Sequence, residues 1–166
     1  MKTTKKLLAI FFVAATMMFA ACSEKENNPV SVDLSGTSWE ATIDNVYNYQ
    51  GIVDMIISGV MSMDFTSSTA GELYTNVTVS VPDIPGNDQT RDDTEEFTYT
   101  FDGTTLTLTS TGEDATTGDN GTMTYNAGDK TFTMIIPDES YEGMNLRDLY
   151  GSDRVVFRLV RGTVNF

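Results

Sequence analysis

Residues 97–109 read Phe97-Thr98-Tyr99-Thr100-Phe101-Asp102-Gly103-Thr104-Thr105-Leu106-Thr107-Leu108-Thr109. Apolar residues and threonines alternate with a period of two on both sides of Asp102-Gly103, which is typical of strands with one buried face and one wet face. Asp-Gly between two such runs is the strongest short-range signal for a β-hairpin. The stretch therefore predicts two antiparallel strands, over 97–101 and 106–109.

The same alternation recurs outward from this hairpin, and no segment after the first 21 residues shows a convincing helical period. The further runs are 39–43, 61–65, 73–81, 122–125, 131–136 and 154–161. With the hairpin they make eight strands. Parallel strands would need crossover helices that this pattern does not contain, so we expect an all-β, antiparallel barrel or sandwich.

The lengths of the links between the predicted strands favour the barrel. Short links, over 66–72, 102–103 and 126–129, alternate with long ones, over 44–59, 82–94, 110–120 and 137–153. In an up-and-down barrel, alternate links fall at opposite ends, which would give one tight end and one loop-rich mouth. A Greek-key β-sandwich, the alternative, has no reason to sort its loops in this way.

Three stretches between about residues 34 and 161 resemble the lipocalin-like (calycin) domains of bacterial lipoproteins. They are the opening Leu34-Ser35-Gly36-Thr37-Ser38-Trp39-Glu40, the Asp-Gly hairpin, and the last strand, Val155-Val156-Phe157-Arg158-Leu159-Val160-Arg161. The resemblance implies an eight-stranded barrel whose base is closed by Gly36 and Trp39, with Arg161 packed over the tryptophan. In the family one residue separates the glycine from the tryptophan (Gly-x-Trp), whereas in this chain two residues separate Gly36 from Trp39.

The geometry of a closed barrel also brings Arg161 to Trp39, because the end of the last strand lies beside the start of the first. Period-two parity places Arg161 on the face of Val155, Phe157 and Leu159, which should point inward. We expect Arg161 either to stack on the indole of Trp39 or to be a solvated charge at the strand end.

The first residues of the chain predict export and lipidation. Lys2, Lys5 and Lys6 precede an apolar run over 7–19 and the sequence Ala20-Ala21-Cys22, which is typical of a lipoprotein signal peptide and too short for a spanning helix. We expect a signal peptide over 1–21, a lipidated Cys22 with acyl chains such as palmitate on a polar tether over 22–33, and a barrel domain over 34–166. Ser23-Glu24-Lys25-Glu26 resembles acidic signals that send lipoproteins to the cell surface. The expected location is therefore the outside of the outer membrane, with its periplasmic face as the alternative.

The charge of the mature chain excludes one class of partner. The signal peptide removes three of the ten basic residues, so seven Lys and Arg would face 24 Asp and Glu, a net charge of −17. Nucleic acid needs a basic footprint, and no such partner is expected. The membrane contact should be the lipid on Cys22, and we expect a monomer.

Residue types argue against catalysis. The chain has no histidine, and its single cysteine is the lipidation site, so it lacks the usual general base, nucleophile pair and soft metal ligands. We predict no enzyme activity, no cofactor and no metal site, although a pair of carboxylates acting on glycosides stays open. The loop over 112–121 is rich in oxygen ligands, but its spacing does not match a calcium loop.

The long links place a candidate ligand site at the mouth. They hold 14 of the 24 acidic residues and four of the seven tyrosines. The candidate ligand-binding residues are Tyr47, Tyr49, Tyr141, Met144 and Tyr150. Aromatic residues beside a cavity suit a small, neutral or cationic, largely apolar ligand. The same residues could instead form a lid that plugs the barrel, in which 138–142 and 144–150 make one short helix. The alternatives for function are a non-catalytic accessory subunit with a solid barrel and an acidic end for a basic protein partner, or carbohydrate binding on tyrosine platforms.

Overall fold

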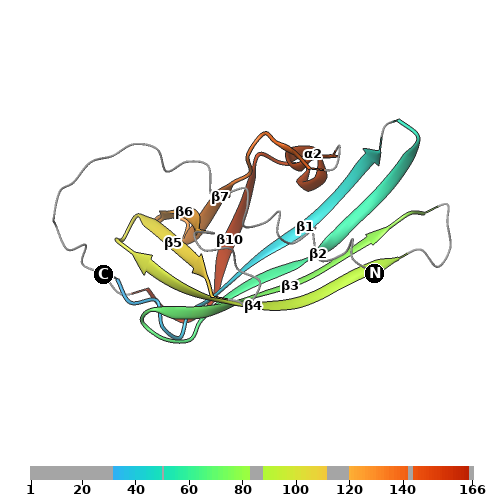
Figure 1. The fold of residues 1–166 in the computed structure, drawn as a ribbon. Helices are drawn as coiled ribbons and strands as arrows, with labels where there is room; N and C mark the ends of the chain where they lie inside the picture. The colour runs from blue at the N-terminus through green and yellow to red at the C-terminus, as the bar shows by residue number, and fades with distance from the viewer. Residues whose placement is uncertain (1–31, 50, 83–87, 112–119, 142–143, 165–166) are drawn as a thin grey trace.

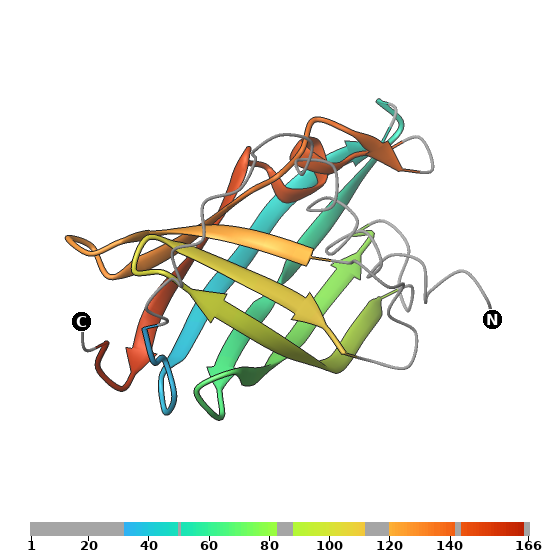
Figure 2. The ribbon, with the colours of Figure 1, turned by 60° about the vertical axis from the view of Figure 1, so that its left-hand side comes forward.

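The computed structural model describes residues 32–49, 51–82, 88–111, 120–141 and 144–164. It confirms the predicted architecture, which is all-β with a closed, eight-stranded, antiparallel up-and-down barrel (Figures 1 and 2). The order around the barrel is β1-β10-β7-β6-β5-β4-β3-β2. The barrel strands are β1 Ser38–Tyr49, β2 Val53–Phe65, β3 Ala70–Ser80, β4 Gln89–Phe101, β5 Thr105–Ser110, β6 Asn120–Asn126, β7 Thr131–Ile135 and β10 Arg154–Arg161.

Between β7 and β10 the chain forms a small separate unit. Strands β8 (Ser140–Tyr141) and β9 (Met144–Asn145) pair with each other and lead into the short helix α2 (Leu146–Tyr150). The predicted helix over 138–142 and 144–150 is wrong for its first part, because 140–141 and 144–145 pair as strands and the helix covers only 146–150. Among the described residues no helix combines the length and the apolar character needed to cross a membrane.

One predicted loop is wrong. The segment 44–59 is not a long link, because β1 and β2 run through it in continuous register, from Ser38 opposite Asp64 to Tyr49 opposite Val53, and only residues 50–52 join them. Similarly, β4 begins at Gln89 and not at Phe97. The additional strand residues, 44–49, 53–59 and 89–96, include Asn, Asp and Thr on faces that are partly in contact with water. They therefore lack the alternation of apolar and polar residues that is typical of a strand with one buried face.

The barrel therefore has two sections of different construction. In the closed section all eight strands pair, and β4 reaches β5 only through Phe97 to Phe101. In the open section, β1 to β4 continue as a long four-stranded sheet, where residues 89–96 of β4 pair with β3 (Figure 1). The open section lies at the end of the barrel where α2 packs, opposite the end at which β1 begins.

Aromatic rings fill the closed section. Phe132 is fully buried, and its ring centroid lies 4.5 Å from that of Trp39, 5.1 Å from Tyr125 and 5.4 Å from Phe101. Phe65 adds edge contacts with Phe97 and Tyr99. These mostly edge-to-face pairs are the favoured geometry for aromatic groups, so this section is a solid floor below the open section.

The segment before β1 seals the base of the closed section. The amide of Val32 donates to the carbonyl of Phe101 at 2.8 Å, and the amide of Gly36 donates to Phe65 at 2.8 Å. Leu34 is fully buried, and its amide donates to the hydroxyl of Tyr99, which itself donates to the carbonyl of Ser67. The chain thus enters the barrel at the closed end.

The two candidate closure residues have separate roles, and stacking of Arg161 on Trp39 is wrong. Trp39 is fully buried among the rings, and its indole N–H donates to Thr37 at 2.9 Å. Arg161 is 70% exposed and pairs with Asp64 at 3.2 Å. The register shifts at Ser38, which lies opposite Arg161, whereas Trp39 lies opposite Leu159. This bulge reverses the parity of Arg161, so the guanidinium reaches the outer face. Gly36 has a φ of +76° and forms the tight turn before Trp39.

Candidate functional site

The inward face of the barrel changes character between its two sections. Side chains alternate along a strand, so Gly71, Leu73, Thr75, Val77 and Val79 of β3 share one face. The first three are buried, whereas Val77 and Val79 are partly exposed. Met55 of β2, two positions beyond the buried Ile57, is also partly exposed. The inward face is sealed below this level and accessible above it.

Strand β4 adds a polar row to the same face. Arg91, Asp93 and Glu95 are in phase with the buried residues Phe97, Tyr99 and Phe101. A guanidinium nitrogen of Arg91 lies 2.8 Å from a carboxylate oxygen of Asp93, and only 24% of the Arg91 side chain is exposed. Glu95 accepts a hydrogen bond from the hydroxyl of Ser110 on β5. The inward face of the open section, which we name the upper lumen, therefore joins an apolar strip of Ile57, Val77 and Val79 to this polar row.

The predicted ligand-binding residues are spread over three elements. Tyr47 and Tyr49 lie on β1 and not on a loop, so their predicted placement is wrong. Tyr141 and Met144 lie opposite each other in the β8–β9 pair, and Tyr150 is the last residue of α2. The side chains of Tyr49, Tyr141 and Met144 lie outside what the structure describes. Tyr47, Leu149 and Tyr150 are partly buried and pack against the core.

The side chain of Asn45 on β1 is hydrogen-bonded to helix α2. Its side-chain amide donates to the carbonyls of Asp148 at 2.8 Å and Leu149 at 3.0 Å, at the C-terminal end of the helix, where backbone carbonyls need partners from outside the helix. Leu146 is buried, and burial raises the pKa of Tyr150 well above 10. Helix α2 therefore packs against β1 at this end of the barrel.

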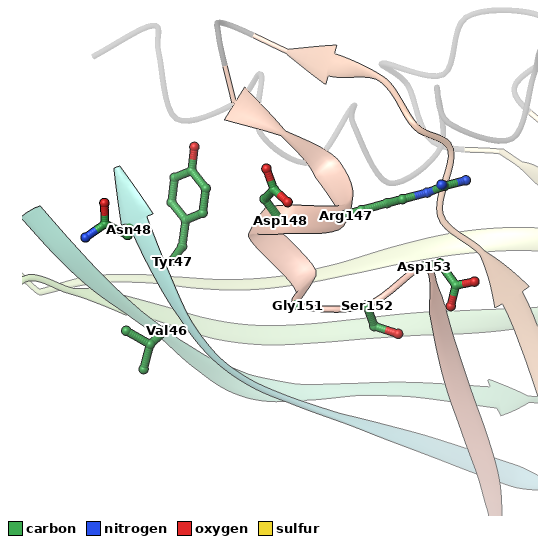
Figure 3. A pocket seen from close by; sticks show the side chains of 8 residues that line it. All are labelled: Val46, Tyr47, Asn48, Arg147, Asp148, Gly151, Ser152 and Asp153. Atoms are coloured by element: carbon green, nitrogen blue, oxygen red, sulfur yellow. The ribbon is translucent and has the colours of Figure 1, made fainter. Parts of the chain in front are cut away.

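A shallow pocket of about 540 Å³ lies next to this attachment, between β1 and the segment formed by α2 and the turn that follows it (Figure 3). Its lining comes from Val46, Tyr47 and Asn48 on β1 and from Arg147, Asp148, Gly151, Ser152 and Asp153. Of the five predicted ligand-binding residues, Tyr47 is the one that lines it.

The acidic residues are less concentrated at the mouth than the predicted loops imply. Asp44, Asp54, Asp92 and Asp93 lie on strands, and the first three are exposed on the outer face. The candidate calcium ligands of 112–119 lie outside the described residues. Within the described part of the chain, no group of three His, Cys, Asp or Glu side chains gathers as a metal site would require.

The upper lumen was not among the residues predicted for the site. The signal that could have identified it is the phase of β4, because Arg91, Asp93 and Glu95 continue the inward parity of Phe97, Tyr99 and Phe101. An interpretation of 89–96 as solvated loop and strand start hides this parity.

Comparisons with known proteins give no relative: no protein-family model matches the chain, and neither the curated proteins nor the solved structures contain a match. The architecture alone does not assign an activity, since one fold carries many functions.

Proposed function

We propose that this protein is a non-catalytic, lipid-anchored binding protein that holds a small, amphipathic ligand of neutral or cationic charge in the upper lumen. The observation that carries the proposal is the partial exposure of Val77 and Val79 on the inward face, directly above a solid aromatic floor. Apolar side chains that point into a barrel and still contact solvent are suited to contact a ligand.

The chemistry of the upper lumen supports the class of ligand. Ile57, Val77 and Val79 suit an apolar body, and the polar row beside them suits a hydrogen-bonding group. Asp93 and Glu95 outnumber Arg91, which is already paired with Asp93. An anionic group would therefore meet net repulsion, whereas a neutral or cationic group would not.

Filling the upper lumen tests the proposal. We expect wild-type protein, purified from its own cells and studied by native mass spectrometry, to carry a bound small molecule, and Val77→Trp to lose at least 90% of it. The matched control is Thr78→Trp, because Thr78 lies next in the chain on the opposite face, where its hydroxyl contacts that of Thr90 at 2.9 Å. Equal ligand content in both variants, or none in the wild type, would favour a solid barrel that serves as an accessory subunit.

The proposed anchor has a separate test. Replacing Cys22 by serine removes the only cysteine of the chain and with it the site for acyl chains. Because no other membrane contact is proposed, we expect Cys22→Ser to move the protein from the membrane fraction to the soluble fraction. Immunoblots of fractionated cells measure this, and a variant that stays in the membrane fraction contradicts lipid anchoring.

The entry of the chain supports an orientation for the anchored protein. Residues 32–37 are hydrogen-bonded under the closed end, so a tether from Cys22 arrives at that end. The upper lumen then faces away from the membrane. On the cell surface, the predicted location, this arrangement directs the ligand site to the exterior.

A further inference from the structure

The pocket beside α2 lies along the edge of β1 and not over one of its faces. Three consecutive residues of β1, Val46, Tyr47 and Asn48, line it. Successive side chains of a strand point to opposite faces, and Figure 3 shows Val46 and Tyr47 extending to opposite sides of β1. A space that all three residues border therefore lies beside the backbone of the strand. We name it the edge slot. Its far wall is formed by Arg147, Asp148, Gly151, Ser152 and Asp153.

The backbone groups of β1 that face the edge slot have no strand partner among the described residues. Directly before β1, the carbonyl of Thr37 accepts from the amide of Phe65 at 3.0 Å. Hydrogen-bonded pairs alternate along an antiparallel ladder, and β1 and β2 keep one register throughout. Tyr47 therefore bonds to β2, whereas the N–H and C=O groups of Val46 and Asn48 point away from β2. On that side, β10 pairs only with the first three residues of β1.

This unpaired edge is open to a further strand. Val46 is 61% exposed, so an apolar residue and free backbone groups meet at the same place, which is a template for strand pairing. The slot ends at Asn45, whose side chain bonds to α2 and lies against Gly151. Val46 to Asn48 span about 10 Å, which three residues of an extended chain match. We propose that an extended segment of a partner protein adds to β1 in this slot as an antiparallel strand.

The charge around the edge slot defines the segment as basic. The guanidinium of Arg147 extends away from Tyr47 in Figure 3, because its Nε donates to the carbonyl of Ile136 at 2.9 Å and it pairs with Asp138 at 3.6 Å. Asp148 has no ion pair within the described part of the chain, so its carboxylate leaves this wall with an unbalanced negative charge. A cationic side chain on the segment would balance it.

The parity of an antiparallel pair gives the order of residues in the segment. Residues directly opposite each other share a face, so the residue opposite Tyr47 lies beside its ring. In Figure 3 this ring and the carboxylate of Asp148 extend in the same direction, and a lysine there would contact both. The residue opposite Val46 lies on the outer face, where a β-branched apolar residue suits it. The segment therefore reads polar, lysine, valine from its N-terminus, opposite Asn48, Tyr47 and Val46.

Saturation-transfer NMR of the mature, lipidated protein in phosphatidylcholine nanodiscs tests the assignment with the peptide acetyl-Ser-Thr-Lys-Val-amide. We expect its valine methyl protons to receive saturation. N-methylation of the valine removes the N–H that would donate to the carbonyl of Val46 and should weaken binding at least tenfold. The matched control is N-methylation of the lysine, whose amide points away from β1 and which should keep the affinity within about threefold.

Variants of the protein test the two sides of the slot. Val46→Pro removes an N–H that faces the slot and not β2, and we expect it to weaken binding at least tenfold. Asp148→Asn should weaken binding about three- to fivefold, as expected for an exposed ion pair. Its control is Asp44→Asn, which removes the same charge from the outer face of β1 and should leave binding unchanged.

Four results would overturn the assignment. They are no saturation transfer at millimolar peptide, equal effects of the two N-methyl groups, unchanged binding in Val46→Pro, and equal binding of a peptide with glutamate in place of lysine. Self-association in sedimentation velocity that Val46→Pro abolishes would identify a second copy of this chain as the occupant instead. The inference does not depend on a ligand in the upper lumen, so Val77→Trp should keep the peptide signal.

Discussion

Replacing Phe132 by alanine is expected to lower the free energy of unfolding by about 3 to 5 kcal/mol, which is a large part of the total stability of an ordinary domain. Phe132 is fully buried, and its ring lies within 6.5 Å of the rings of Trp39, Phe65, Phe101 and Tyr125. Removal of the ring leaves a cavity that four large side chains cannot fill together. Urea denaturation followed by tryptophan fluorescence measures the loss, because Trp39 is the only tryptophan.

The matched control lies in the same strand. Ile135 is 48% exposed on the outer face of β7, and Ile135→Ala should change the free energy of unfolding by less than about 1 kcal/mol. Similar losses in the two variants would mean that the aromatic floor does not hold the closed section together.

Gly59→Ala is expected to cost about 3 kcal/mol, at the upper end for overpacking, although it adds one methyl group. Gly59 of β2 lies opposite Val77 of β3. A Cβ at this position would come within 2.6 Å of the Cα of Val77 and still closer to the carbonyl oxygen of Asn76. Both atoms belong to the backbone of β3, so the strand itself must move, and the sheet that forms the upper lumen moves with it.

The neighbouring residue provides the comparison. Ser58 is exposed on the outer face, and Ser58→Ala should stay within about 0.5 kcal/mol of the wild type. Denaturation curves of the two variants measure the difference. A fully stable Gly59→Ala protein would contradict the close approach of the β2 and β3 backbones at this position.

The closed section could be predicted from the sequence because each of its strands packs one face on the core. Around Asp102-Gly103 the buried residues Phe97, Tyr99, Phe101, Leu106 and Leu108 alternate with threonines, and this alternation predicts the hairpin. In the open section, apolar and polar residues do not alternate with buried and exposed positions in this way. On β1, Val46 is 61% exposed while Asn45 is partly buried, so hydrophobicity and burial no longer coincide. The sequence pattern therefore predicts loops where the open section has strands.

The details of the sites depend on local geometry that sequence spacing does not carry. The parity of Arg161 is set by one bulge, and a bulge inserts a residue without a distinctive sequence pattern. The residues that line the same pocket as Tyr47 come from α2 and the turn after it, about a hundred positions further along the chain. Only the barrel closure, through pairing of β1 with β10, brings these segments together.

The central claim is that the inward face of β3 is sealed at Leu73 and open at Val77. Reaction with a small maleimide tests it in a Cys22→Ser background, where Leu73→Cys or Val77→Cys supplies the only thiol of the chain. Leu73 is 6% exposed, whereas Val77 is partly exposed four residues further along the same face. The structure predicts that Val77→Cys reacts at least ten times faster than Leu73→Cys in the folded protein, and that bound ligand slows it. Equal and slow reaction at both positions would contradict an open upper lumen.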